Sequence, residues 1–258
     1  MEINLKEEIH AILENFLEVL EIDNISLNKH QEYLILISHK QLIITETIFE
    51  LLNKKNPDIN SIVTLTRLII ENYLVNYFLH FEKVTSDEKE YRHLLYKYCG
   101  LFNRNKYTTK EREELEVEKK KNNEELEEIK SLISQNLFYK KLNPKNFPIK
   151  IFDKIKYFEK IKYFEKTDIN NDAISTFWRL FSNYAHSEYI SIINYITIKN
   201  DSVKEKLILD FCSEFLIYIN LKLKKNIQIL FKEKSDFFQP LFLEVIFDDF
   251  EDNFLASF

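Results

Sequence analysis

Arg179 and His186 lie seven residues apart in the segment WRLFSNYAHSEY. In a helix, seven residues make two turns less about 20°, so both side chains leave the same face. Ser182 and Asn183 lie near the same stripe and add polar groups between them. A guanidinium can hold a phosphate in two-pronged fashion, and an imidazole can move a proton near neutral pH. This pattern suits metal-free cleavage of RNA, in which a 2′-hydroxyl attacks its own phosphate. The alternative is structural, with the histidine hydrogen-bonded inside a bundle and the arginine paired to a carboxylate.

A second charged pair, Arg67 and Glu71, lies at i and i+4 in the otherwise apolar segment TRLIIENYL. Burying either charge alone is costly, so we expect each to have a partner. An internal ion pair is one interpretation. The other is that Glu71 reaches another helix and orients Arg179 or His186, as a supporting carboxylate does. The order Arg before Glu is the weaker one for an intrahelical pair, which favours the outside partner.

Two Glu-x-x-His elements, at residues 7–10 and 90–93, match an element of di-iron helical bundles. Such a site also needs a lone glutamate on each of two further helices, for which Glu46 and Glu71 are candidates. One element lies in the first turn of the chain and the other in a charge-dense run. We therefore expect solvated helix faces at both places, and no metal or other cofactor.

The elements that position these residues must be helices, because glycine occurs once and proline four times in 258 residues. A β-sandwich needs many tight turns, and a nucleotide-binding α/β fold needs a glycine-rich loop. The two cysteines have no paired spacing, so we expect no disulfide framework. Composition therefore predicts an all-α protein, a multi-helix bundle of about eight helices with a projecting charged helical arm. Apolar spacing predicts helices over residues 3–21, 28–54, 59–82, 87–103 (ending near Gly100), 109–137, 172–196, 202–233 and 236–257.

Residues 1–234 are predicted to form a single helical bundle. Within it, residues 109–137 are rich in charge and read as a solvated helical arm or hairpin, with partial disorder as the alternative. Thr108 and Glu111 fit a capping box at the start of this arm. Residues 138–170 form a connector that contains the tandem repeat IKYFEK–IKYFEK, which we interpret as a duplication in a surface segment.

The last 24 residues, 235–258, form an acidic, Phe-rich tail with six acids and no base. These six acids equal the net charge of −6, so the rest of the chain is neutral overall. A neutral body neither requires nor excludes a nucleic-acid partner, because binding depends on local patches. The tail is predicted either to pack its phenylalanines on the bundle or to dock on a partner.

The Arg-x6-His pattern of Arg179 and His186 resembles the Arg-x(4–6)-His signature of HEPN proteins, and the likeness spans about residues 35–215. A related helical family pairs an Arg-x-x-x-Glu helix with a Ser-x-x-x-His helix, which correspond here to Arg67 and Glu71, then Ser182 and His186. The resemblance implies a dimeric, metal-independent ribonuclease in which Arg179 stabilises the phosphate and His186 is the general acid/base. It gives Asn183 a polar supporting role.

The resemblance predicts an endoribonuclease that acts as a toxin or phage-defence effector, with RNA as substrate and a second copy of the chain as partner. The residue after the arginine is usually polar in HEPN proteins and is Leu180 here. This departure supports an alternative, a catalytically inactive interaction or regulatory subunit that binds proteins through the 109–137 arm or the 236–258 tail. No stretch reaches the roughly 18 apolar residues of a membrane span, so we expect no membrane contact and a cytoplasmic location.

Overall fold

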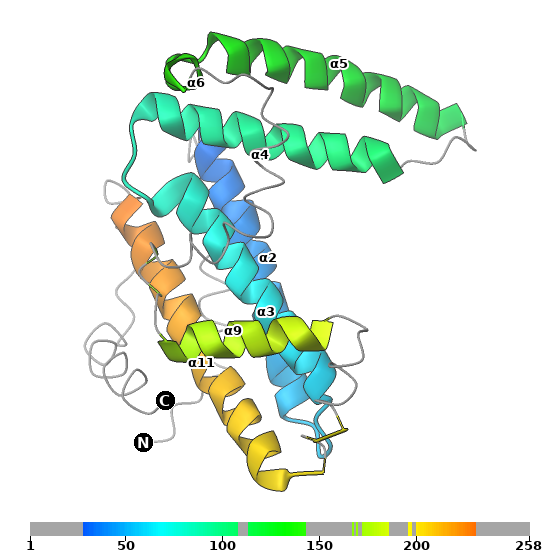
Figure 1. Ribbon diagram of the computed structural model, residues 1–258, viewed down its shortest axis with the longest axis vertical. Coiled ribbons are helices and arrows are strands. Elements are labelled where there is room, and N and C mark those ends of the chain that lie inside the picture. The colour runs from blue at the N-terminus through cyan, green and yellow to red at the C-terminus, as the bar shows by residue number, and fades with distance from the viewer. Residues whose placement is uncertain are drawn as a thin grey trace, which may run out of the picture. The chain divides into compact units, whose positions relative to one another are not determined.

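The computed structural model describes residues 28–107, 113–142, 172–185 and 200–230, with residues 167, 169, 196 and 197. Within this part the chain forms seven α-helices, one π-helical turn and no strand, which confirms the all-α prediction (Figure 1). The chain divides into two compact units, Met1–Tyr77 with Lys166–Phe258, and Phe78–Glu165. Several predictions fall outside the described residues: the helix at 3–21, the capping box at Thr108, the tandem repeat and the acidic tail.

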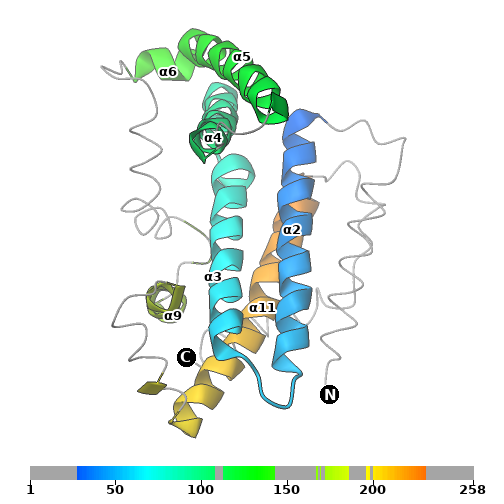
Figure 2. The same cartoon turned by 90° about the vertical axis from the view of Figure 1, so that its right-hand side faces the viewer.

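In the first unit, α2 (Lys29–Leu52), α3 (Ile59–Asn76) and α11 (Ser202–Leu230) run side by side, and α9 (Asp172–Ala185) crosses α3 (Figures 1 and 2). These bounds agree with the helices expected at 28–54, 172–196 and 202–233, as far as those segments are described. The helix expected at 59–82 differs in one respect. It ends as an α-helix at Asn76 and continues as the π-helical turn η1 (Tyr77–Phe81).

Local side chains set the helix starts of this unit. The Asn28 side chain accepts a hydrogen bond from the Gln31 backbone N–H, and the Gln31 side chain accepts one from Asn28, each at 3.0 Å. Together they form a capping box. Asp58 caps α3 directly after Pro57, and Asp201 caps α11 by accepting from two backbone N–H groups. These caps satisfy amide groups that have no partner inside the helix.

A buried polar network lies between α2 and α11. Gln41 donates a side-chain hydrogen bond to Asn220 at 3.1 Å, and Asn220 donates to the Thr45 hydroxyl at 3.0 Å. All three residues are buried among apolar side chains. Because each buried polar group needs a partner, this network specifies how the two helices align along their axes. No pattern in the sequence indicates this network, because its members on α2 and α11 lie about 175 residues apart along the chain.

In the second unit, α4 (Ser86–Tyr107) and α5 (Glu113–Gln135) form an antiparallel hairpin, and α6 (Leu137–Lys141) packs against both (Figure 1). The charged arm expected at 109–137 is thus helical over α5. The first residues of the expected connector at 138–170 belong to α6. Aromatic and aliphatic side chains of the three helices form one apolar core: Tyr91, Leu95, Tyr98, Cys99, Leu126, Ile129 and Ile133.

The expected helix end near Gly100 is wrong, because α4 continues to Tyr107. A single glycine inside a helix destabilises it by only about 1 kcal/mol relative to alanine, and the packing of the surrounding residues offsets this loss. Tyr98 and Cys99 belong to the apolar core immediately before Gly100. A Cβ at position 100 would meet no heavy atom within 4 Å, so close packing does not require glycine there.

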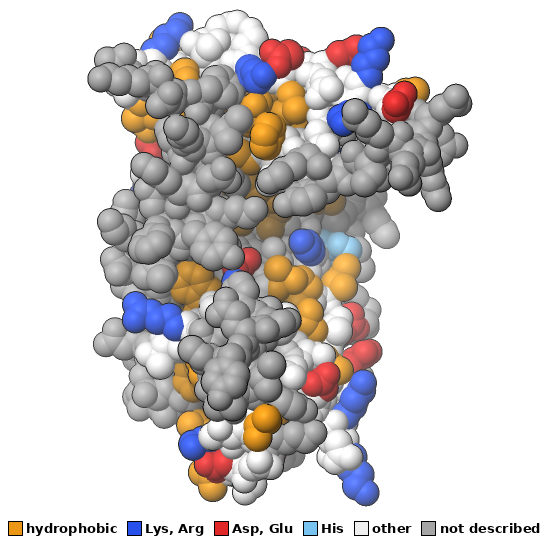
Figure 3. All heavy atoms as spheres, turned by 45° about the vertical axis from the view of Figure 1, so that its right-hand side comes forward, with side chains coloured by type: hydrophobic (Ala, Val, Ile, Leu, Met, Phe, Trp, Pro, Cys, Tyr) orange, Lys and Arg blue, Asp and Glu red, His pale blue; other side chains and the backbone are white. Residues whose placement is uncertain are grey.

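Charges of both signs lie among hydrophobic side chains on the surface that Figure 3 draws. Ion pairs such as Lys97–Glu125 and Arg104–Glu118 connect the exposed sides of α4 and α5.

Among the helices that the structure describes, none is both long and apolar enough to cross a membrane.

Candidate functional site

The helix α9 carries Arg179 on its exposed side. Ile174, Trp178 and Phe181 follow one another at i, i+4 and i+7 and are each at most 5% exposed. This spacing places one apolar stripe against the bundle. Arg179 lies on the opposite side of the helix and is exposed. A ligand can therefore reach its guanidinium.

Ser182 lies one turn before the end of α9 as described. Its hydroxyl donates to the backbone carbonyl of Trp178 at 2.9 Å, so it bonds within its own helix. Such a bond to the i−4 carbonyl often bends a helix slightly. Among the predicted catalytic residues, His186 and the side chain of Asn183 lie outside the described residues.

Arg67 and Glu71 meet on α3, with an Nη2–Oε1 distance of 3.3 Å. Their side chains are 19% and 25% exposed, so the pair is largely removed from water. The Arg67 Nε–H is buried and has no hydrogen-bond acceptor in the described part of the chain. The intrahelical contact agrees with the ion-pair interpretation of this motif.

Since α9 packs against α3, the two helices that carry the predicted residues are neighbours in one unit (Figure 2). The structure brings Arg67 and Glu71 into direct contact. It places Arg179 and Ser182 on the adjoining helix, with Arg179 exposed and Ser182 turned back to its own backbone. The result is an accessible cation next to a helix with a largely buried ion pair.

Of the described residues considered for a di-iron site, Glu71 pairs with Arg67, and Glu90 is exposed on α4. Our expectation of a solvated face is wrong for His93, which is only 6% exposed and packs edge-on against His80 with ring centroids 4.8 Å apart. In the described ranges no three His, Cys, Asp or Glu side chains are grouped so that they could hold a metal ion. The pair Glu7 and His10 lies outside these ranges.

Neither cysteine is suited to act as a nucleophile. Cys99 and Cys212 are both free thiols and both buried. Burial raises the pKa of Cys212 to about 12, against the opposing hydrogen bond with Thr66. A reactive cysteine needs the thiolate form and access to solvent, and Cys212 lacks both near neutral pH.

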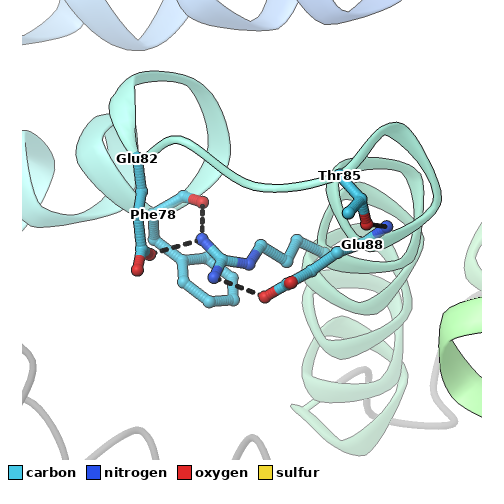
Figure 4. Close-up of polar contacts among 5 residues, drawn as sticks. Phe78, Glu82, Thr85 and Glu88 are labelled. Atoms are coloured by element: carbon cyan, nitrogen blue, oxygen red, sulfur yellow. Dashed lines mark hydrogen bonds and ion pairs between the residues drawn. The ribbon is translucent and has the colours of Figure 1, made fainter. Parts of the chain in front are cut away.

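One polar cluster was missed by the sequence analysis (Figure 4). The buried Arg92 guanidinium donates to the Phe78 carbonyl at 2.8 Å, to Glu82 at 2.6 Å and to Glu88 at 2.7 Å. It also lies 4.5 Å from the centre of the Phe78 ring. The i, i+4 spacing of Glu88 and Arg92 was a visible signal, but the contacts to η1 were not. Because its guanidinium binds three acceptors, Arg92 serves as a structural tie between η1, with the Glu82 that follows it, and α4.

Comparison with known proteins adds no relative: no family model, curated protein or solved structure matches this chain.

Proposed function

We propose that this protein is a HEPN-like, metal-independent endoribonuclease that acts as a toxin or phage-defence effector. The observation that carries the proposal is the exposure of Arg179 on a helix whose opposite face is buried. A lone exposed arginine is common, but this one lies in the Arg-x6-His pattern and on a helix that packs against the Arg67–Glu71 helix. The supporting residues therefore lie in the same unit as the candidate catalytic arginine.

In the proposed reaction, the 2′-hydroxyl of the RNA attacks the adjacent phosphorus. The new 2′-O–P bond forms as the P–O5′ bond breaks, which gives a 2′,3′-cyclic phosphate and a 5′-hydroxyl. Arg179 holds the non-bridging oxygens and stabilises the charge that develops on them. His186 moves the proton between the attacking and leaving oxygens, the role that the resemblance gives it. Two copies of the chain complete the site in a homodimer.

Two matched RNA oligonucleotides test this chemistry. In the presence of a chelator, we expect cleavage of the all-ribose oligonucleotide, with a cyclic phosphate end, and loss of cleavage in His186→Ala. The same oligonucleotide with a 2′-deoxy sugar at the cleaved position should stay intact, because it lacks the nucleophile. Cleavage of the 2′-deoxy position, or loss of all activity with the chelator, would overturn the mechanism.

A second candidate function is a catalytically inactive interaction or regulatory subunit. The second unit supports it, because the α4–α5 hairpin, which contains the predicted arm, builds its own core. Apolar side chains are exposed at Val117 in α5, at Leu137 in α6 and at Leu142 after it, and such residues mark a contact surface where they lie together. If folded, dimeric wild-type protein cleaves no RNA, this function replaces the first.

A further inference from the structure

Two phenylalanines of α9 close on one phenylalanine of α11. Phe177 stacks on Phe211 with ring centroids 3.6 Å apart and planes inclined by 10°. Phe181 meets the same ring edge-on, at 5.9 Å and 65°. The edge-to-face pair is a favourable arrangement of aromatic rings, and the close stacked pair buries one face of each ring against the other. We call these three residues the α9 clamp.

The α9 clamp lies on the side of the helix opposite Arg179. Phe177 and Phe181 are each two residues from Arg179, and two residues correspond to about 200° of helical rotation. The contact of the two rings with Phe211 therefore fixes the rotation of α9 about its axis, and with it the direction in which Arg179 points. A rotation of α9 that released the rings would also turn Arg179 toward the bundle.

The helix α9 depends on such contacts. It has 14 residues, a length at which an isolated helix is marginal in water. Phe211 itself is fully buried, and on α11 its ring also stacks on that of Phe215 at 5.6 Å. We infer that Phe211 is a positioning residue, which holds α9 docked in the rotation that presents Arg179 to solvent. Its effect on catalysis rests on the proposed ribonuclease function, whereas its effect on α9 does not.

The chain contains a built-in reporter of this docking. Trp178 is the only tryptophan of the protein, lies on α9 next to Arg179, and is 5% exposed. In Phe211→Leu, we expect the emission of Trp178 to shift to the red and its quenching by acrylamide to increase, while far-UV circular dichroism keeps its helical signal. The loss of two aromatic pairs should raise the undocked fraction of α9 by roughly tenfold or more.

The matched control is Phe215→Leu. It removes the same ring from the same helix, and its described ring contacts are with Phe211 and Tyr218 on α11 and with no ring of α9. We expect it to lower global stability and to leave the native emission of Trp178 unchanged. An unchanged emission in Phe211→Leu, or an equal red shift in both variants, would overturn the inference.

Two further measurements cover the remaining outcomes. If Phe211→Leu loses its helical signal, the same criteria are applied to Phe177→Leu, which removes the half-buried ring of the α9 clamp. Ribonuclease activity is then measured on the same samples. If Phe211→Leu shows the red shift but cleaves RNA at the wild-type rate, Phe211 does not position Arg179. If Phe211→Leu shows the red shift and the wild-type protein itself cleaves no RNA, Phe211 still docks α9, and only the proposed ribonuclease function is contradicted.

Discussion

Arg67 and Glu71 form an ion pair one turn apart on α3, with 3.3 Å between Nη2 and Oε1 and both side chains largely buried. The order of the two residues is the less favourable one for an intrahelical pair, yet they meet. The neighbouring helix α9 carries the exposed Arg179. Burial explains the pairing, because either charge alone would be costly at this position.

Glu71→Gln removes the charge that compensates Arg67. We expect the free energy of unfolding to fall by about 1–2 kcal/mol, because the largely buried guanidinium keeps its charge and its Nε–H already has no acceptor in the described residues. Urea unfolding measures the change. The control is Glu50→Gln on the exposed side of α2, which should change stability by less than about 0.5 kcal/mol. Equal effects of the two variants would contradict the account.

Arg92→Met removes the tie between η1 and α4. Its side chain is 9% exposed and its guanidinium donates to three acceptors, so its loss should lower the free energy of unfolding by about 2–4 kcal/mol. Arg92→Lys should recover only part of this, because an ammonium cannot reproduce the planar fork. Arg104→Met is the control, since Arg104 is 61% exposed and its pair with Glu118 contributes little. A loss in Arg104→Met as large as that in Arg92→Met would refute the structural role of the tie.

Two buried tyrosines should respond in opposite directions when their hydroxyl is removed. The Tyr91 hydroxyl has no hydrogen-bond partner among the described residues, and burial, followed by Tyr139 and Cys99, raises its pKa to about 12. The Tyr73 hydroxyl accepts from the Asn226 side chain at 2.8 Å. We expect Tyr91→Phe to be neutral or to stabilise by up to about 1 kcal/mol, and Tyr73→Phe to destabilise by about 1 kcal/mol. Thermal unfolding of both variants tests the sign.

The helix starts expected at residues 28 and 59 agree with α2 and α3, because local groups set both starts. Asn28 caps α2, and Pro57 precedes Asp58, the cap of α3. Gly100 is a misleading signal, because the low helix propensity of glycine is overridden by the packing of Tyr98 and its neighbours against α5. Local preference decides a helix end only where packing does not.

The environments of Arg92 and His93 could not be predicted from the sequence. Both lie in a charge-dense run, and periodicity alone does not reveal that a second element, η1, packs against that side of α4. In the structure, Arg92 binds Phe78 and Glu82, and His93 packs against His80. Partners distant in sequence leave no trace in the spacing of a single helix. For the same reason the spacing of Arg179 indicated a shared face but not its exposure.

The cap of α11 gives a pH dependence. The backbone N–H of Lys204 and then its side chain bond the Asp201 carboxylate and hold its pKa below the ordinary value. A carboxylate whose pKa is lower in the folded than in the unfolded protein stabilises the fold at pH values above its unfolded pKa. This stabilisation is lost as the pH falls through the folded pKa. The stability difference between wild type and Asp201→Ala should therefore shrink as the pH falls below about 4. The stability difference between Asp201→Asn, which keeps the cap, and Asp201→Ala should stay constant over this pH range, because neither variant titrates at this position. A difference independent of pH would contradict the prediction.

The most direct test of the central claim is the rate of RNA cleavage by Arg179→Ala in the presence of a chelator. Lys225→Ala is the matched control, because Lys225 is an exposed cation on α11 in the same unit. The account predicts that wild type and Lys225→Ala cleave at similar rates, and that Arg179→Ala loses roughly 10²–10³-fold while its unfolding curve is unchanged. Cleavage by Arg179→Ala at the wild-type rate would contradict it.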